Sequence, residues 1–564
     1  MKYLNKTKTF IFFFIFCFLM NTFSQESLKS SEEDYYDFLS LTGHTERNFL
    51  FYRTLEESTW NIKSETEDYI HVWNNNNLGH TNNFFNNDNI KYKIYAPELF
   101  TSYNKEAPFG YNDGGLWQGK GFNSAFSAGF RAEAYGFSLS VKPQLSWSQN
   151  KNFELMPAYS GISEYGYFWG GCDAPQRFGD SDFWNFDWGD TEIRYSYKSI
   201  TLGFGTESIW LGPMQLYPVL HSNNAPTYPK FDIGLRRTQI NIPFTNIYLG
   251  DIESRLWVGR LEESDYFDSN NDNNYNQFSG FTFAYAPSFI KGLTLAVTKV
   301  TLNKWGENFW RYALPNWATN TIVTSDGNSG EDQKAAISAE WLFPTVGLDI
   351  YGELGFDDFL SKGFKVYEYA RYPFHAMTYA IGIKKSFEIS KQKKLRGVLQ
   401  LEWNNTEGSQ DYQMWTGSGY NFGFHYQITQ GYTNKGQWLG SGIGYGGNSQ
   451  NISFTLYSPH GYEKIFLGRN NIDNNYVFYQ SVDAGKEETQ YNGARYFTAF
   501  KANLYLGIEN LYYFNPDLSI KYSFVYDMVI NPTYTPGYNK TQGAWRDYDY
   551  LNNFYCSLAL KYQF

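Results

Sequence analysis

The chain has 564 residues, of which 46 are Lys or Arg and 57 are Asp or Glu, so its formal net charge is −11. A chain this acidic repels a phosphate backbone, and we expect no nucleic acid among its partners. Mean hydropathy is only −0.51, and beyond the N-terminal leader no run of 18 apolar residues occurs, so we expect no transmembrane helix.

The first 24 residues have the pattern of a secretory signal peptide. Lys2, Lys6 and Lys8 precede an apolar run from Phe10 to Met20, and small polar residues follow. The run is too short to span a bilayer. We expect cleavage after Ser24, which removes three lysines and no acidic residue and takes the formal charge from −11 to −14.

Residues 25–75 are predicted to form a short helical plug on the periplasmic side of a larger domain. Ser31 and Asp34 resemble a capping box at a helix start, and Gly43 supplies a stop signal. We expect one or two short helices here, placed so that they close the mouth of that domain. The apolar residues that share one helical face are Tyr35, Phe38 and Leu39.

The stretch GGLWQGKG, residues 114–121, comes within one residue of the phosphate-binding loop G-x-x-x-x-G-K-[ST]. Gly121 stands where that loop needs a hydroxyl to ligate Mg²⁺. Such a loop also leads into a helix, whereas residues 126–134 alternate in the manner of a strand. We therefore reject a nucleotide site and expect the glycines to permit a tight turn or a close backbone approach.

From residue 76 onward, short segments alternate apolar and polar side chains. Every second residue from Phe137 to Trp147 is apolar, and Gly136 before them predicts a hairpin turn. Low mean hydropathy and an aromatic content of 20% fit a transmembrane β-barrel, because only alternate residues face lipid and aromatic girdles mark both interfaces. The same alternation recurs in residues 399–403, 452–456 and 518–526.

We therefore predict an all-β fold: an antiparallel barrel over residues 76–564, with about 16 to 20 strands. The final strand ends at Phe564 and resembles the signal that the outer-membrane barrel assembly machinery reads. That machinery and outer-membrane lipid are the partners expected for such a chain. A secreted β-sandwich is the alternative, although its strands would not need so many aromatic residues.

The polar stretch DSNNDNNYNQ, residues 268–277, begins like a calcium-binding loop. The pattern then fails, because Asn273 stands where Gly is required and Ser279 where a bidentate Glu is required. A solvated extracellular loop is the expected structure.

Motifs for catalysis are weak. Asp190 and Glu207 could be paired carboxylates of a glycosidase, but nothing in the sequence sets their separation. No nucleophile elbow or metalloprotease helix occurs, and the seven histidines lack metal-ligand spacing. We predict no enzyme, no cofactor and no metal; a barrel enzyme with an isolated Ser/His pair stays open as an alternative.

Two cysteines, Cys172 and Cys556, remain once Cys17 leaves with the leader. An oxidising compartment would permit them to form a bridge, but we expect them to be unpaired.

Five stretches of the sequence together point to one known family. They are YYDFLSLTG (35–43), YNDGGLWQGKGFN (111–123), FDWGDTEIRYSYKSITLGFGTESIWLGP (186–213), HSNNAPTYP (221–229) and GYTNKGQWLGSGIGYGGNS (431–449). These stretches resemble the Wzi-type capsule assembly proteins. The resemblance implies an outer-membrane barrel of 18 strands with a periplasmic helical bundle, which acts as a lectin and holds capsular polysaccharide on the cell surface. Three departures from the family pattern, at Asp190, at Leu211 and at Thr227–Tyr228, leave the recognised sugar open.

Within these stretches, side chains suited to sugars stand close together. A sugar ring stacks on an aromatic face, and its hydroxyls bond to amides and charged groups. The alternatives are packing against the plug, turn building around the two asparagines and, for arginine, a salt bridge. Arg236 and Arg237 are successive strand residues, so at most one points inward. The carbohydrate-binding candidates are Trp117, Lys120, Asn123, Trp210, Asn223, Asn224 and Arg236.

The leading hypothesis is therefore a non-enzymatic outer-membrane protein that binds and attaches capsular polysaccharide or exopolysaccharide. A passive or gated porin is the second hypothesis, and the structural barrel of a secretion or motility complex is the third.

Overall fold

A computed structural model describes most of the chain. The predicted signal peptide and Phe564 lie outside the described residues, so the structure does not test them. The described residues are 31–53, 60–62, 82–84, 87–245, 247–313, 330–357, 377–408, 422–476, 501–515, 517–534, 538–539, 544–545 and 549–562.

The chain begins with the predicted helix, α2 (Ser31–Leu41). Gly43 ends it with φ +80°, and the amide of His44 donates to the carbonyl of Leu39 over 2.8 Å. After the helix the chain forms β1 (Thr45–Arg47) and β2 (Tyr52–Arg53), and β1 pairs with β3 (Trp60–Ile62). The stop at Gly43 is the αL cap that glycine favours.

The rest of the described chain forms a closed antiparallel barrel of eighteen strands, which confirms the predicted fold. Two of the eighteen are each built from two shorter strands. The spans are β5 (Asn87–Asn104), β6 (Gly121–Ala134), β7 (Phe137–Val141) with β8 (Gln144–Ser148), β9 (Phe183–Asp187) with β10 (Glu192–Tyr197), β11 (Ile200–Gly205), β13 (Lys230–Asn241), β14 (Tyr248–Glu262), β15 (Tyr275–Pro287), β16 (Leu293–Lys304), β17 (Glu331–Phe343), β18 (Leu348–Asp357), β19 (Met377–Ser390), β20 (Leu395–Asn405), β23 (Asn448–Ser458), β24 (Gly461–Asn471), β25 (Ala502–Asn515), β26 (Leu518–Ile530) and β29 (Tyr550–Tyr562).

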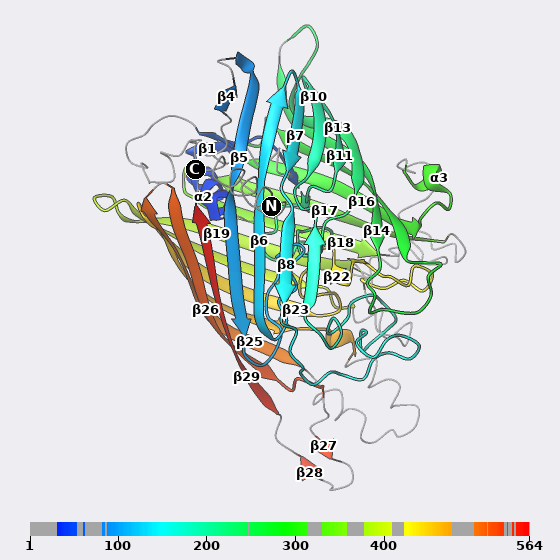
Figure 1. Cartoon of the computed structure of the whole chain (residues 1–564). Coiled ribbons are helices and arrows are strands. Elements are labelled where there is room, and N and C mark those ends of the chain that lie inside the picture. The colour runs from blue at the N-terminus through cyan, green and yellow to red at the C-terminus, as the bar shows by residue number, and fades with distance from the viewer. Residues whose placement is uncertain are drawn as a thin grey trace, which may run out of the picture.

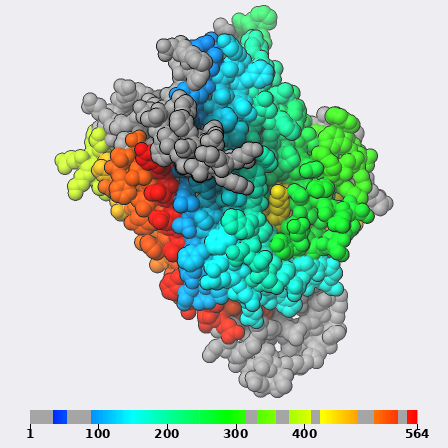
Figure 2. Space-filling view, viewed as in Figure 1, coloured from blue at the N-terminus to red at the C-terminus, as the bar shows by residue number. Residues whose placement is uncertain are grey.

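The last strand closes the ring on the first. β29 pairs with β5 from Tyr555–Asn104 to Lys561–Glu98. Figure 2 shows the red C-terminal strand directly beside the blue N-terminal strands. Closure removes the free edges that a sheet would otherwise present to lipid, where backbone groups find no partners.

The segment predicted as one strand from Phe137 to Trp147 is instead two strands, β7 and β8. Both pair with β6 on one side, but on the other side β7 pairs with β10 and β8 pairs with β9. The break falls at Lys142–Pro143, since proline has no N–H to donate to a neighbouring strand. Gly136 forms the hairpin turn that the sequence predicts, with φ +88°.

The connections at the two ends of the barrel differ in length. Those at the end where β6 meets β7 are two to six residues long, and those at the other end are 12 to 42 residues long. Short turns face the periplasm in outer-membrane barrels, and long loops face outward. Helix α2 packs at the short-turn end, against Leu342, Tyr457, Tyr462 and Leu511, so the helix predicted for the plug lies at that end of the barrel (Figure 1).

The outer face of the wall is apolar. In β18, for instance, Ile350 and Leu354 are exposed, whereas Tyr351 and Glu353 between them are buried and point inward. In the described part of the chain no helix is long and apolar enough to cross a membrane.

A hydrophobic core lies inside the barrel, which the sequence did not predict. Inward residues of the wall, such as Trp257, Phe278 and Val300, pack against Tyr52 and against two loop segments, 206–229 and 422–447. These loops carry β12 (Trp210–Leu211), which pairs with β2, and the hairpin β21 (Thr433–Asn434) and β22 (Gln437–Trp438). The described segments of these loops therefore fold inward and pack inside the long-loop half of the lumen.

The remaining elements are small and lie outside the wall's eighteen spans. They are β4 (Asn82–Phe84), α3 (Phe309–Ala313), β27 (Tyr538–Asn539) and β28 (Ala544–Trp545). The loop predicted over residues 268–277 is confirmed for residues 268–274, where Asp268 and Asn270 each accept the amide two residues on. Residues 275–277 instead begin β15. Both cysteines are free, which confirms the expectation for Cys172 and Cys556.

Candidate functional site

The loop between β5 and β6, residues 105–120, carries the motif YNDGG and turns into the lumen. Asn104 anchors it, because its side-chain amide donates to the carbonyls of Phe109, Gln118 and Gly119 over 3.0 to 3.1 Å. Asn123 anchors it from the other side: its Nδ2 donates to the carbonyl of Gly119 over 3.1 Å, and its Oδ1 accepts from Ser148 over 2.6 Å. The fully buried Asn123 thus shapes the loop.

Trp117 and Lys120 lie on the same loop, away from the lumenal cavity. The Trp117 ring contacts Phe178 at 5.0 Å between centroids, and Lys120 lies 3.4 Å from a carboxylate oxygen of Glu106. Glycine at position 115 lets the backbone of this loop lie close to the barrel wall, because a Cβ on Gly115 would lie 2.8 Å from the Cβ of Asp187. The expected close backbone approach is therefore confirmed at Gly115.

Trp210 and Asn224, on the loop between β11 and β13, make contacts that fold the lumenal loops. Trp210 is fully buried, its indole N–H donates to the carbonyl of Met214 over 2.8 Å, and Arg53 lies over its ring at 5.1 Å. Asn224 accepts the amide of Asn112 over 3.1 Å and donates to the carbonyl of Trp438 over 3.0 Å. Asn224 therefore joins the loop between β11 and β13 to the loop between β5 and β6 and to the segment that contains Trp438.

Asn223 faces a cavity beneath the motif. Two adjoining cavities of about 240 and 450 Å³ share walls that include Glu98, Asn112, Asp113 and Lys521, and we call them together the lumenal chamber. Asn223 and the motif's Asn112 both line it. In each, Oδ1 is buried without a hydrogen-bond partner in the described structure. A buried polar atom left unpaired in this way costs free energy, so the chamber is suited to a hydrogen-bond donor.

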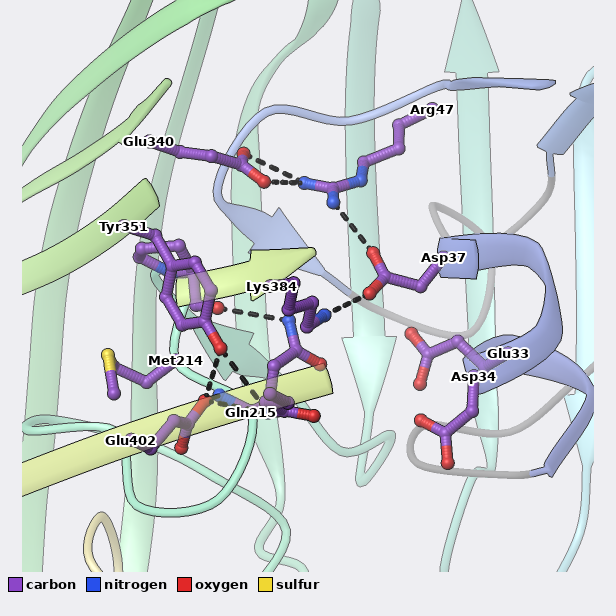
Figure 3. Close-up of polar contacts among 12 residues, drawn as sticks. Glu33, Asp34, Asp37, Arg47, Met214, Gln215, Glu340, Tyr351, Lys384 and Glu402 are labelled. Atoms are coloured by element: carbon purple, nitrogen blue, oxygen red, sulfur yellow. Dashed lines mark hydrogen bonds and ion pairs between the residues drawn. The ribbon is translucent and has the colours of Figure 1, made fainter. Parts of the chain in front are cut away.

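The plug forms part of the chamber wall, through Asp34 and Asp37 of α2. Asp37 accepts from Lys384 of the barrel wall and, over 2.7 Å, from Arg47, which in turn donates to Glu340 (Figure 3).

Glu402 of the wall holds the lumenal loop in a similar way. Its carboxylate accepts the amides of Gln215 and Leu216, each over 3.0 Å, and the Tyr351 hydroxyl over 2.7 Å (Figure 3). Plug, wall and loop are therefore fixed to one another around the chamber by charge-assisted hydrogen bonds, which are the stronger kind.

Residues 94–541 of the chain match the model of the family described as capsule assembly protein Wzi. The chain belongs to this family. A solved Escherichia coli structure, Wzi, described as an outer-membrane protein involved in group 1 capsule assembly and as a carbohydrate-binding β-barrel, is similar over 97% of this chain and 100% of its own, with 12% identity and a TM-score of 0.59. At this identity the likeness shows the fold.

Two other solved structures resemble the chain more distantly. OccK8 (OprE) of Pseudomonas aeruginosa is 9% identical over 84% of this chain and 98% of its own, with a TM-score of 0.38. OprB of Pseudomonas putida is 11% identical over 84% of this chain and 94% of its own, with a TM-score of 0.34. No curated protein sequence matches the chain.

Within the family's matched span, the two arginines of β13 differ in their surroundings. Arg237 donates to Asp251 over 2.6 Å and to Glu46 of the plug over 2.9 Å, so it faces the lumen. A bulge between Leu235 and Thr238 interrupts the register here. The amide of Arg236 donates to the carbonyl of Ser199, and Arg236 does not line the lumenal chamber.

Of the seven candidates from the sequence, the structure places only Asn223 on the chamber wall. Residues that the sequence reasoning missed are Asn112 and Asp113, although they stand inside the quoted motif, and Lys521 and Ala559 of β26 and β29. Inward alternation in those two strands was the available signal, because Lys521 and Ala559 are paired in register on one face.

The chamber contains a carboxyl group whose titration can be tested. Burial raises the pKa of Asp113 to about 7, while the Gln118 amide, donating to it over 2.7 Å, acts in the opposite direction. Because Asp113 ionises at a higher pH in the folded protein than in the unfolded chain, its contribution to the free energy of unfolding is fully present below pH 4. That contribution is lost as the pH rises towards and through 7. We expect the Tm of the detergent-solubilised protein to fall between pH 5 and pH 8.

Asp113→Asn should flatten this decline, because the side chain it introduces does not ionise. Thermal unfolding of both forms at pH 5 and pH 8 measures the difference. An equal decline in wild type and Asp113→Asn would assign the pH dependence to other groups.

Proposed function

We propose that this protein binds capsular polysaccharide or exopolysaccharide and attaches it at the outer membrane, without catalysing a reaction. Membership of the capsule assembly family supports the proposal. Export through the signal peptide of residues 1–24 and insertion by the barrel assembly machinery through the C-terminal strand belong to the same proposal.

The observation that carries the proposal is the packed lumen. The loop segments 206–229 and 422–447 and the plug residue Tyr52 form a hydrophobic core with the inner wall, where a porin has a water-filled path. A barrel filled in this way serves as a rigid support for its outer loops. This argues for attachment and against the porin hypothesis.

The outer loops offer aromatic surface to a sugar. Tyr159 and Tyr426 are exposed, at 46% and 67%, and lie on two loops that pack together through Trp169 and Phe424 at 5.2 Å. An exposed aromatic ring stacks on the apolar face of a sugar ring, and a rigid base reduces the entropy lost on binding.

A strain lacking the protein should release polysaccharide into the medium while total polysaccharide stays unchanged. The measurement is the ratio of cell-attached to released polysaccharide, with total quantified alongside. An unchanged ratio would refute the attachment function, and a large steady conductance of the purified barrel would favour the porin hypothesis instead.

In the complemented strain, the double substitution Tyr159→Ala and Tyr426→Ala should reduce the attached fraction several-fold, since each stacking contact contributes about 0.5–1.5 kcal/mol. Phe289→Ala is the control, because Phe289 is also an exposed aromatic residue, at 77%, but lies on a short turn at the opposite end of the barrel. An equal effect of the control would indicate a general loss of assembly.

A further inference from the structure

The lumenal chamber runs through the barrel as far as its short-turn end. Its wall includes Tyr457 and Tyr462, which flank the short turn at 459–460, and Ser519, which follows the short turn at 516–517. Its roof is formed by the loop between β5 and β6, through residues such as Phe109 and Asp113, and by Gln215, Leu216 and Tyr217 of the loop between β11 and β13. Neither Tyr159 nor Tyr426 lines the chamber, so it is separate from the exposed tyrosines.

The chamber roof presents hydrogen-bond acceptors. The backbone amide of Gly114 donates to the carbonyl of Asn223 over 2.8 Å, which fixes the two loops side by side. The Oδ1 atoms of Asn112 and Asn223 stay buried and unpaired within the described structure. The Asn112 amide nitrogen is already committed to the carbonyl of Leu216 over 2.9 Å. Two fixed acceptors without donors suit a ligand rich in hydroxyl groups.

Charge on the walls disfavours an acidic ligand. Eight carboxylate side chains and five lysines line the chamber. Two of the lysines are held by carboxylates, since Lys521 lies 3.3 Å from Glu509 and Lys384 contacts Asp37. The net negative lining repels carboxylates and phosphates and is compatible with uncharged hydroxyls.

Size and aromatic content also fit a sugar. The larger cavity, about 450 Å³, lies within the range of ligand pockets in proteins. Rings of Phe109, Tyr111 and Tyr217 line it and contact each other edge-to-face, with Phe109 and Tyr111 5.8 Å apart and Tyr111 and Tyr217 5.8 Å apart. Aromatic faces combined with fixed amides are a common basis for saccharide binding.

We propose that the lumenal chamber binds an uncharged saccharide unit on the periplasmic side, at a site separate from the outer aromatic surface. The proposal deepens the proposed function and rests on it, because it names the class of sugar and a second place where the polysaccharide is held. Asn112 and Asn223 bind its hydroxyls, and the carboxylates of the wall select against acidic sugars.

The test fills the chamber and leaves the outer loops unchanged. Ala559 lines both cavities, so Ala559→Trp occupies the space a sugar would take. Leu560→Trp is the matched control, because the next residue of the same strand is 45% exposed on the lipid face. Fragments of the cell's own surface polysaccharide, released by mild acid and separated by anion exchange into uncharged and acidic pools, serve as probes in calorimetric titration of the purified barrel.

We expect the wild type and Leu560→Trp to bind the uncharged pool and Ala559→Trp to bind it at least tenfold more weakly. Asn223→Ala, which changes little volume, should weaken binding about fivefold, the equivalent of one hydrogen bond. The Tyr159→Ala and Tyr426→Ala protein should bind the short fragments as the wild type does.

The other outcomes distinguish failure of the chamber proposal from failure of the proposed function. Equal binding by wild type and Ala559→Trp, no binding of fragments by a wild type that binds intact polysaccharide, or preference for the acidic pool would each overturn the chamber proposal and leave attachment standing. A wild type that binds neither fragments nor intact polysaccharide would overturn the proposed function itself. Weaker binding by Asn223→Ala as well would show that the loss of binding in Ala559→Trp does not come from misfolding of that variant.

Discussion

Asp232→Ala is expected to destabilise the barrel by about 3–5 kcal/mol, because it leaves two buried guanidinium groups without their shared carboxylate. Asp232 of β13 accepts from Arg194 of β10 over 2.9 and 2.7 Å and from Arg255 of β14 over 2.8 Å. All three residues are about 1% exposed. The network therefore ties three strands together inside the wall.

Urea unfolding in detergent, followed by the heat-modifiable mobility of the folded barrel in electrophoresis, measures this change. Glu388→Ala is the control: its pair with Arg396 spans 3.0 Å but lies at the surface, with Glu388 about half exposed. Such pairs contribute only about 0–1 kcal/mol. Equal midpoints for Asp232→Ala and Glu388→Ala would show that the buried network is not needed for stability.

Glu253→Ala is expected to release the plug segment that follows α2. The carboxylate of Glu253, only 1% exposed, accepts three successive backbone amides, those of Leu50, Phe51 and Tyr52, over 2.8 to 3.0 Å. Truncation leaves these buried amides without that acceptor, at a cost of about 1–3 kcal/mol each. Trypsin should then cut after Arg47 and Arg53 more than tenfold faster than in the wild type.

Limited proteolysis with mass spectrometry measures the two cleavage rates. Glu253→Gln retains one carbonyl oxygen and should give an intermediate rate. Glu262→Ala, on the same strand, removes a partly exposed carboxylate 3.7 Å from Lys435 and should leave the plug protected. Unchanged protection in Glu253→Ala would mean that the core around Tyr52 alone holds the segment.

The wall of the barrel was predictable from the sequence because its pattern of side chains involves only neighbouring residues in the chain. Alternation such as that around Ile350 and Leu354 assigns the lipid face directly, and Gly43 and Gly136 mark turns through their own backbone preference. The division of the predicted strand at Pro143 was missed, because it depends on β7 and β8 pairing with different neighbouring strands. Pairing partners far away in sequence are not encoded locally.

The interior could not be predicted in the same way. Trp210, Phe422 and Tyr432 lie in polar loops without periodicity, so nothing local distinguishes an aromatic residue on an outer surface from one in a lumenal core. Asn123 and Asn224 suggested sugar recognition by residue type, and their hydrogen bonds to backbone carbonyls became visible only in the folded structure. The chamber combines residues from the two ends of the chain, such as Glu98 and Ala559.

The closed ring has a consequence for biogenesis. The pairing of β29 with β5 encloses a core made by loops that are contributed from the middle of the chain. These loops are joined to the strands at the long-loop end of the barrel, so residues such as Trp210 reach their places through that end and not through the wall. Closure of the ring and packing of its interior are therefore separable steps, and a variant with a damaged core should still join β29 to β5 during assembly.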